Sequence, residues 1–210
     1  LNGCSSGCDQ DERGCREPPL TIETARTCLV EEAAALGVGG GVALASGFAE
    51  AGARGLDRQQ RLAATALDAD MALLGPNGIG GWSVAAHFAA FSPPLPGSPR
   101  QGGVAVVSQS GGLLLEIANP LIERGVGLSH LLSSGNEAAT TLEALLGYLL
   151  ELPEVRVGVA IVESFRSPGL LPALLQRAAA RRKPLIVLKV GRSSAGSRAA
   201  ASHTGALAQD

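Results

Sequence analysis

The sequence predicts an α/β protein of two units, a small one followed by a larger one built on a parallel sheet. Short apolar runs of strand length alternate with segments of helical composition along most of the 210 residues. The 28 glycines and 12 prolines fall between these segments and not in one low-complexity tract. With 46% hydrophobic but only 3% aromatic residues, the chain is expected to bury ordinary cores that small side chains pack.

The first unit is expected over residues 20–97, after an atypical segment of residues 1–19 that contains no strand-like apolar run. Its expected elements, in chain order, are a helix over Thr21–Leu36, a strand over Val42–Ala45, a helix over Asp57–Leu67 and a strand over Met71–Leu74. Residues 92–99 contain four prolines and can continue neither a helix nor a central strand. We therefore expect the first unit to end near residue 97.

The second unit, residues 98–210, shows a more regular alternation of strands and helices. Its expected strands are Val104–Val107, Gly127–Leu132, Val155–Val162 and Leu185–Val190, and its expected helices are Leu113–Arg124, Leu142–Leu150 and Leu170–Arg182. Pro120 should kink or interrupt the first of these helices, because it removes a backbone donor. The unbroken apolar character of the last strand predicts burial on both faces of a parallel sheet.

Charge and composition argue against several classes of partner. The net charge is −2 and the 17 Lys and Arg residues are spread along the chain, so neither nucleic acid nor an anionic membrane surface is expected. No apolar run reaches the length of a membrane-spanning helix, and the N-terminus lacks signal-peptide features, so a cytoplasmic protein is expected. The four cysteines, Cys4, Cys8, Cys15 and Cys28, match no common zinc spacing, and no metal site is expected.

A candidate anion site follows the strand at Val104–Val107. Residues Ser108, Gln109, Ser110, Gly111 and Gly112 lead directly into a helix, whose unpaired amide groups and positive dipole end suit a phosphate. The segment matches neither of the common nucleotide fingerprints, and an ordinary turn with a capping serine fits it equally well.

Three further segments carry candidate functional residues. Gly75, Pro76 and Asn77 end a strand where open α/β sheets bind ligands, although this is also a common turn sequence. His203 lies in a loop of small residues, and a neutral imidazole can attack phosphorus and pass the group on. Glu163 ends a strand and could orient an imidazole. Asn136 and Glu137 follow another strand and fit a helix cap, whereas His87 and His130 are interpreted as structural.

Six segments occur in an order typical of one protein family. They are Ala45–Glu50, Leu74–Asn77, Val107–Gly111, Ser134–Ala138, Lys189–Ser193 and Ser202–Ala208. In this order they resemble the nucleoside-diphosphate-forming acyl-CoA ligases, the family of ADP-forming acetate-CoA ligase, with succinyl-CoA synthetase alpha subunits as more distant relatives. The resemblance implies an incomplete Rossmann-like CoA-binding domain, followed by a flavodoxin-like parallel-sheet domain that is truncated at its C-terminus.

The resemblance also implies roles for the candidate residues. His203 would be the phosphohistidine, Glu163 the carboxylate that positions it, and residues 108–112 the helix start that receives its phosphate. Residues 75–77 would lie beside CoA. The implied reaction interconverts acyl-CoA, nucleoside diphosphate and phosphate with a carboxylic acid, CoA and nucleoside triphosphate, through an acyl phosphate and the phosphohistidine. ADP or ATP with Mg²⁺ would bind a separate ATP-grasp domain or beta subunit.

Several positions depart from the family pattern. The family's first strand and glycine-rich CoA loop should precede Thr21, and the chain ends at Asp210, soon after His203, without an ATP-grasp unit. Relatives often carry an acid at Ala139 and Cys or Thr at Gly78. We therefore expect a fragment, a truncated product or a subunit that needs partners.

Two other functions stay open from the sequence. One is a noncatalytic module that senses acyl-CoA, and the other is an unrelated flavodoxin-like binding domain. Retention of His203 and Glu163 favours the ligase over the sensor, because sensing relatives tend to lose the histidine. The acyl substrate, the choice between ADP and GDP, and the oligomeric state cannot be read from the sequence.

Overall fold

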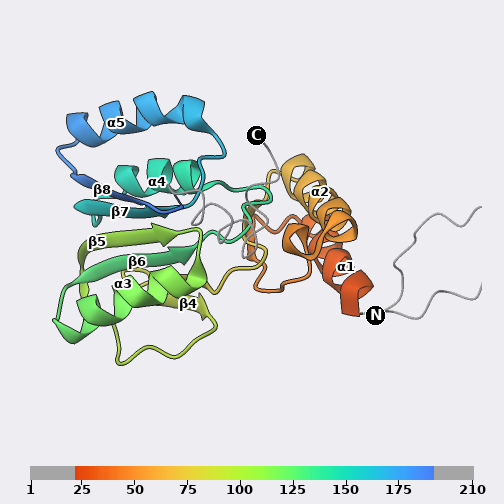
Figure 1. The fold of residues 1–210 in the computed structure, drawn as a ribbon, viewed down its shortest axis with the longest axis horizontal. Coiled ribbons are helices and arrows are strands. Elements are labelled where there is room, and N and C mark those ends of the chain that lie inside the picture. The colour runs from red at the N-terminus through yellow and green to blue at the C-terminus, as the bar shows by residue number, and fades with distance from the viewer. Residues whose placement is uncertain (1–21, 192–210) are drawn as a thin grey trace, which may run out of the picture.

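The computed structural model describes residues 22–191, which form two sheets with helices packed against them (Figure 1). The strands are β1 (Gly40–Val42), β2 (Ala72–Leu74), β3 (Gly80–Ser83), β4 (Phe88–Phe91), β5 (Gln101–Ser108), β6 (Leu128–Ser133), β7 (Val157–Val162) and β8 (Leu185–Lys189). The helices are α1 (Ile22–Ala35), α2 (Ala53–Asp68), α3 (Gly111–Glu123), α4 (Leu142–Glu151) and α5 (Leu171–Ala180), with short 3-10 turns η1 (Ala49–Ala51) and η2 (Pro168–Leu170). The predicted α/β class is confirmed.

The larger sheet has its helices on both faces, as Figure 1 shows. Its strand order is β4-β3-β6-β5-β7-β8, and β5 lies between β6 and β7. Neighbouring residues of a strand point to opposite faces, so Ala105 and Val107 of β5 pack with α4 and α5, whereas Val106 packs with α3. All three side chains are fully buried, which explains the unbroken apolar run of this strand.

The smaller sheet consists of β1 and β2, which run parallel with Gly41 opposite Leu73. Its core is made by the buried side chains of Phe48, Leu62, Ala66, Met71 and Leu73. Leu62 and Ala66 lie one turn apart on α2, so this helix covers the sheet with one apolar face.

A hairpin of β3 and β4, which the sequence analysis missed, joins the larger sheet. β3 runs antiparallel to both β4 and β6, with Gly81 opposite Leu132. The larger sheet is therefore mixed: β5 to β8, from the second expected unit, run parallel as predicted, and the antiparallel hairpin comes from the first expected unit. The proline-rich residues 92–99 connect β4 to β5, so the expected boundary near residue 97 falls between two strands of one sheet.

Two other expectations are corrected. The strand at residues 185–189 was predicted to be buried on both faces, but Ile186, Val187 and Leu188 are 57%, 46% and 47% exposed. The reason is position, because among residues 22–191 β8 is the outermost strand of the sheet and pairs with β7 alone. Pro120 does not interrupt its helix, since α3 continues from Gly111 to Glu123 around it.

None of the helices between residues 22 and 191 is long and apolar enough to cross a membrane. Within the same residues, no group of three or more His, Cys, Asp or Glu side chains is arranged to hold a metal ion. Cys28, on α1, has a free thiol.

Candidate functional site

The candidate residues within the described range gather at one edge of the larger sheet. β5, β6 and β7 are parallel neighbours, so their carboxyl ends share this edge. Residues 108–112 lie at the end of β5 and Glu163 follows β7, whereas residues 75–77 follow β2 and are bonded to the loop after β6. Figure 1 shows the ends of β5 and β6 pointing toward the small unit that contains α1 and α2. The edge is therefore covered by loops from both units.

The phosphate loop, residues 108–112, forms the turn between β5 and α3. Ser110 is the N-cap of α3, and its Oγ accepts a hydrogen bond from the Leu113 amide at 3.3 Å. The Ser108 hydroxyl donates to the carbonyl oxygen of Ser110 at 2.7 Å, which fixes the turn. The remaining amides of the first helical turn have no partner within the helix, and the loop borders a cavity of about 230 Å³ with Asn77, Gly78 and Ile79. The loop is thus a capped helix start that borders a cavity.

Gln109 connects this loop to β7. Its side-chain oxygen accepts hydrogen bonds from the amides of Glu163 at 2.7 Å and Ser164 at 3.0 Å, and its amide nitrogen donates to the Ser164 carbonyl at 2.6 Å. The residue is buried, with 3% of its surface exposed. The sequence suggested that Gln109 binds phosphate, but its side chain is engaged with the backbone of residues 163 and 164.

Glu163 ends β7 and is buried next to the phosphate loop. Its amide is held by Gln109, and its carbonyl oxygen accepts a hydrogen bond from Lys189 Nζ at 2.6 Å. The backbone of Glu163 is therefore fixed from both neighbouring strands. His203, the predicted phosphohistidine, lies outside the described residues.

The predicted CoA loop, residues 75–77, is bonded to the loop that follows β6. The carbonyl oxygens of Gly75 and Pro76 accept hydrogen bonds from the amides of Ala138 at 3.0 Å and Asn136 at 2.8 Å. Asn77 donates through Nδ2 to Asn136 Oδ1 at 3.2 Å. Asn77 also lines the cavity at the phosphate loop, so the structure brings the predicted CoA and phosphate residues together.

Asn136 joins the small unit to the larger sheet. Its Nδ2 donates to Glu50 Oε2 at 2.5 Å and to Gln59 Oε1 at 2.9 Å. Glu50 also accepts the amides of Gly47 and Phe48. Burial alone would raise the pKa of Glu50, but the hydrogen bonds from Asn136 and the backbone outweigh it, so the pKa lies below its usual value.

Two buried acids, Glu137 and Glu143, lie behind the phosphate loop. Glu137 Oε1 accepts hydrogen bonds from the Ser134 hydroxyl at 2.7 Å and from the Leu142 amide, at the start of α4, at 3.0 Å. Glu143 Oε1 accepts the Ser167 amide at 2.9 Å. The other carboxyl oxygen of each acid is buried without a hydrogen-bond partner. Burial, together with the nearby charge of Glu143, raises the pKa of Glu137 to about 7 in spite of the hydrogen bonds that favour its ionised form.

The raised pKa of Glu137 predicts a pH-dependent stability. The unfolded chain releases this proton near pH 4.5, whereas the folded chain holds it to about pH 7. Between these values the folded state binds more protons, so the unfolding free energy falls as pH rises, by about 3 kcal/mol over the window. The contribution is fully present below pH 4.5 and is lost above about pH 7. Urea unfolding at several pH values measures it.

Glu137→Gln supplies the matched control for this measurement. Burial also lowers the pKa of His130, and that effect acts in the opposite direction within the same pH range. The informative quantity is therefore the difference in unfolding free energy between wild type and Glu137→Gln. We expect this difference to change by about 3 kcal/mol from pH 4.5 to 7, and a constant difference would contradict the assignment.

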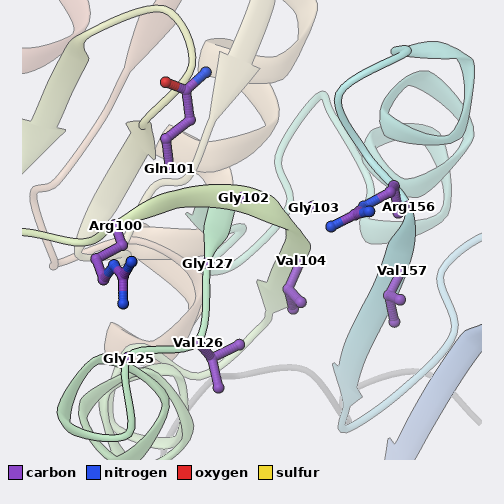
Figure 2. A pocket seen from close by; sticks show the side chains of 10 residues that line it. All are labelled: Arg100, Gln101, Gly102, Gly103, Val104, Gly125, Val126, Gly127, Arg156 and Val157. Carbon is purple, nitrogen blue, oxygen red and sulfur yellow. The ribbon is translucent and has the colours of Figure 1, made fainter.

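A second cavity opens at the opposite edge of the sheet (Figure 2). It has a volume of about 400 Å³ and lies at the amino ends of β5, β6 and β7, between Arg100 and Arg156. None of the predicted site residues lines it. In Figure 2 the Arg156 side chain extends toward Gly103, and the two guanidinium groups do not converge. Open α/β sheets bind ligands at the carboxyl ends of their strands, so we place the candidate site at the phosphate loop.

Some residues of the site were not chosen from the sequence. Glu50, Gln59 and Glu143 received no role, and Asn136 and Glu137 were interpreted as a helix cap. Glu137 does bond to the start of α4, as that interpretation requires. The remaining contacts join residues up to 86 positions apart, and no local pattern marks them.

Comparison with known families gives one match, over residues 101–210, to the succinyl-CoA ligase like flavodoxin domain. The chain is also similar to curated proteins along most of its length. It is 34% identical over 172 residues to "Acetate--CoA ligase [ADP-forming] II subunit alpha" of Pyrococcus furiosus, which covers 82% of this chain and 37% of that subunit. It is 35% identical over 180 residues to "Acetate--CoA ligase [ADP-forming] I" of Archaeoglobus fulgidus, covering 85% of this chain and 26% of that protein.

A solved structure shares the arrangement of both units. It is a dinucleotide forming acetyl-coenzyme A synthetase 1 of Ca. Korarchaeum cryptofilum, in complex with phosphate and ADP. The TM-score is 0.77 at 30% sequence identity, and the match covers 90% of this chain and 40% of that one. The chain thus spans about a quarter to two fifths of the length of these relatives.

Proposed function

Because the chain belongs to the nucleoside-diphosphate-forming acyl-CoA ligases, we propose that it is the part of such a ligase in which His203 carries the phosphoryl group. The observation that supports this most is the phosphate loop, a capped helix start that borders a cavity and is bonded through Gln109 to the backbone of Glu163. The Korarchaeum relative is in complex with phosphate and ADP, so phosphate binding by a relative supports the proposal.

In the proposed reaction, phosphate attacks the acyl-CoA thioester, which gives an acyl phosphate and releases CoA. A nitrogen of the His203 imidazole then attacks phosphorus, the bond from phosphorus to the acyl oxygen breaks, and the carboxylic acid leaves. Amides of the phosphate loop would stabilise the phosphoryl oxygens. The Glu163 carboxylate would accept the proton of the second ring nitrogen and orient the ring. The phosphoryl group finally passes to a nucleoside diphosphate.

The cavity at the phosphate loop would accommodate the reactive end of CoA. Asn77 borders the same cavity as the phosphate loop, so a thioester beside Asn77 would lie close to a bound phosphate. The cavity, about 230 Å³, has room for a phosphate and a small acyl group but not for a whole CoA molecule. The nucleotide part of CoA would therefore lie outside it. ADP and Mg²⁺ would bind an ATP-grasp partner, which agrees with similarity to an enzyme subunit called alpha.

The test is transfer of label from acetyl phosphate, labelled in its phosphoryl group, to the protein. We expect acid-labile, base-stable label on the wild-type chain, and less than a hundredth of it on His203→Asn. His87→Asn is the matched control, because His87 is exposed in the turn between β3 and β4, at a positive φ that asparagine tolerates. Labelled ATP with an ATP-grasp subunit tests the second half of the reaction.

Two results would contradict the proposal. Label that persists in His203→Asn would place the phosphoryl group on another residue. A wild-type chain that binds acyl-CoA but takes no label from either donor would indicate a sensing module instead.

A further inference from the structure

Glu137 lies at the point where the three loops of the site meet. Its carboxyl group accepts a hydrogen bond from Ser134, whose amide donates in turn to the Ser108 carbonyl at 2.8 Å. Gln109 lies beside the same carboxyl group and favours its ionised form. Glu137 therefore contacts the loop after β6 directly, the phosphate loop through Ser108 and Gln109, and the end of β7 through Gln109.

The surroundings of Glu137 disfavour the ionised form of its carboxyl group. Glu137 is 7% exposed, and Glu143 on α4, whose charge acts on it, is 2% exposed. Two ionised carboxylates in such a place repel one another and lack water. The other groups that face Glu137 are neutral donors from Ser134, Gln109 and the Leu142 amide. A neutral Glu137 carboxyl removes the repulsion and keeps Oε1 as an acceptor.

Glu143 binds the loop that follows β7. It accepts the amide of Ser167, in the loop after β7, while Gln109 holds Ser164 in that loop. The segment from Glu163 to Ser167 is thus fixed at both ends by side chains that lie beside Glu137. Displacement of either acid would move the backbone that carries the Glu163 carboxylate.

From this arrangement we infer that Glu137 is a positioning residue for phosphoryl transfer, which aligns Glu163 with the phosphate loop through Gln109 and Ser134. The inference rests on the proposed function for its catalytic consequence. It adds a residue that the reaction itself does not require: the hydrogen bonds that meet at the Glu137 carboxyl group connect the loop after β6 and the start of α4 to the phosphate loop.

The first test does not depend on catalysis. Amide hydrogen exchange of Glu163 and Ser164 reports the bonds to Gln109, because both amides donate to its side-chain oxygen. We expect exchange at these two amides to be at least tenfold faster in Glu137→Ala than in wild type. Glu137→Gln, which keeps a neutral side chain with an acceptor oxygen, should stay within twofold. The control is Glu116→Gln, an exposed acid on α3. Unchanged exchange in Glu137→Ala would overturn the inference.

The second test is the rate of label transfer from acetyl phosphate. We expect this rate to fall at least tenfold in Glu137→Ala and to stay within twofold of wild type in Glu137→Gln, which keeps an acceptor oxygen. The rate of Glu116→Gln should equal that of wild type. Equal rates in Glu137→Ala and wild type would overturn the inference.

The two tests separate the inference from the proposed function. If the wild-type chain takes no label, the proposed function fails, while hydrogen exchange still decides whether Glu137 holds the end of β7. If label is found but amide exchange at Glu163 and Ser164 is the same in Glu137→Ala and in wild type, only the positioning role is wrong.

Discussion

Gln109→Ala is expected to lower the unfolding free energy by about 4 kcal/mol. The alanine removes all three hydrogen bonds between the Gln109 side chain and the backbone of residues 163 and 164. The Glu163 and Ser164 amides both lose the Gln109 oxygen as acceptor, and loss of the acceptor of a buried donor costs about 1–3 kcal/mol. Labelling of His203 should fall as well, because the end of β7 is no longer tied to the phosphate loop.

Urea unfolding of the purified chain measures this loss. Gln176→Ala is the matched control, since the same side chain is truncated at an exposed position of α5. Its unfolding free energy should stay within about 0.5 kcal/mol of wild type. A loss below about 1 kcal/mol in Gln109→Ala would show that the three bonds contribute little.

Gly135→Ala should disrupt the junction between the two units. Gly135 has a φ of +59°, and a Cβ atom there would lie 2.2 Å from the Pro76 carbonyl oxygen. That oxygen accepts the amide of Asn136, so it cannot move away without loss of this hydrogen bond. Left-handed strain and the clash together predict a destabilisation of about 4 kcal/mol.

Gly112→Ala is the matched substitution in the same site. Gly112 lies in the first turn of α3, and a Cβ atom there would meet only the Ser110 hydroxyl at 3.9 Å. Alanine favours a helix over glycine, so we expect a change within about 1 kcal/mol, in the stabilising direction. Thermal unfolding of both variants compares them, and equal melting temperatures would refute the predicted clash at Gly135.

Much of the larger unit could be predicted because its signals are local. β5, β6 and β7 are short apolar runs, and each is followed by a turn and a helix, so their order and approximate bounds follow from composition. The capped helix start at residues 108–112 could be predicted for the same reason, since a strand, a serine-glycine turn and a helix are adjacent in the chain.

The rest depends on distant residues. The hairpin at residues 80–91 is rich in glycine and alanine, and its place is set by pairing with β6, some 50 positions later. The exposure of the β8 side chains could not be predicted from their apolar sequence, because it depends on which elements pack beside this strand. Asn136 binds Glu50 and Asn77, which are 86 and 59 positions away, so its role as a junction appears only in three dimensions.

The placement of the hairpin also orders events during synthesis. β3 and β4 leave the ribosome before β6 exists, so the hairpin must wait for Leu131 and Leu132 before it can join the sheet. Trp82, the sole tryptophan of the chain, lies in β3 opposite Leu131 and contacts Phe91 of β4. The fluorescence of Trp82 is therefore expected to change when the β3–β4 hairpin packs on β6, and it reports this folding step without an added label.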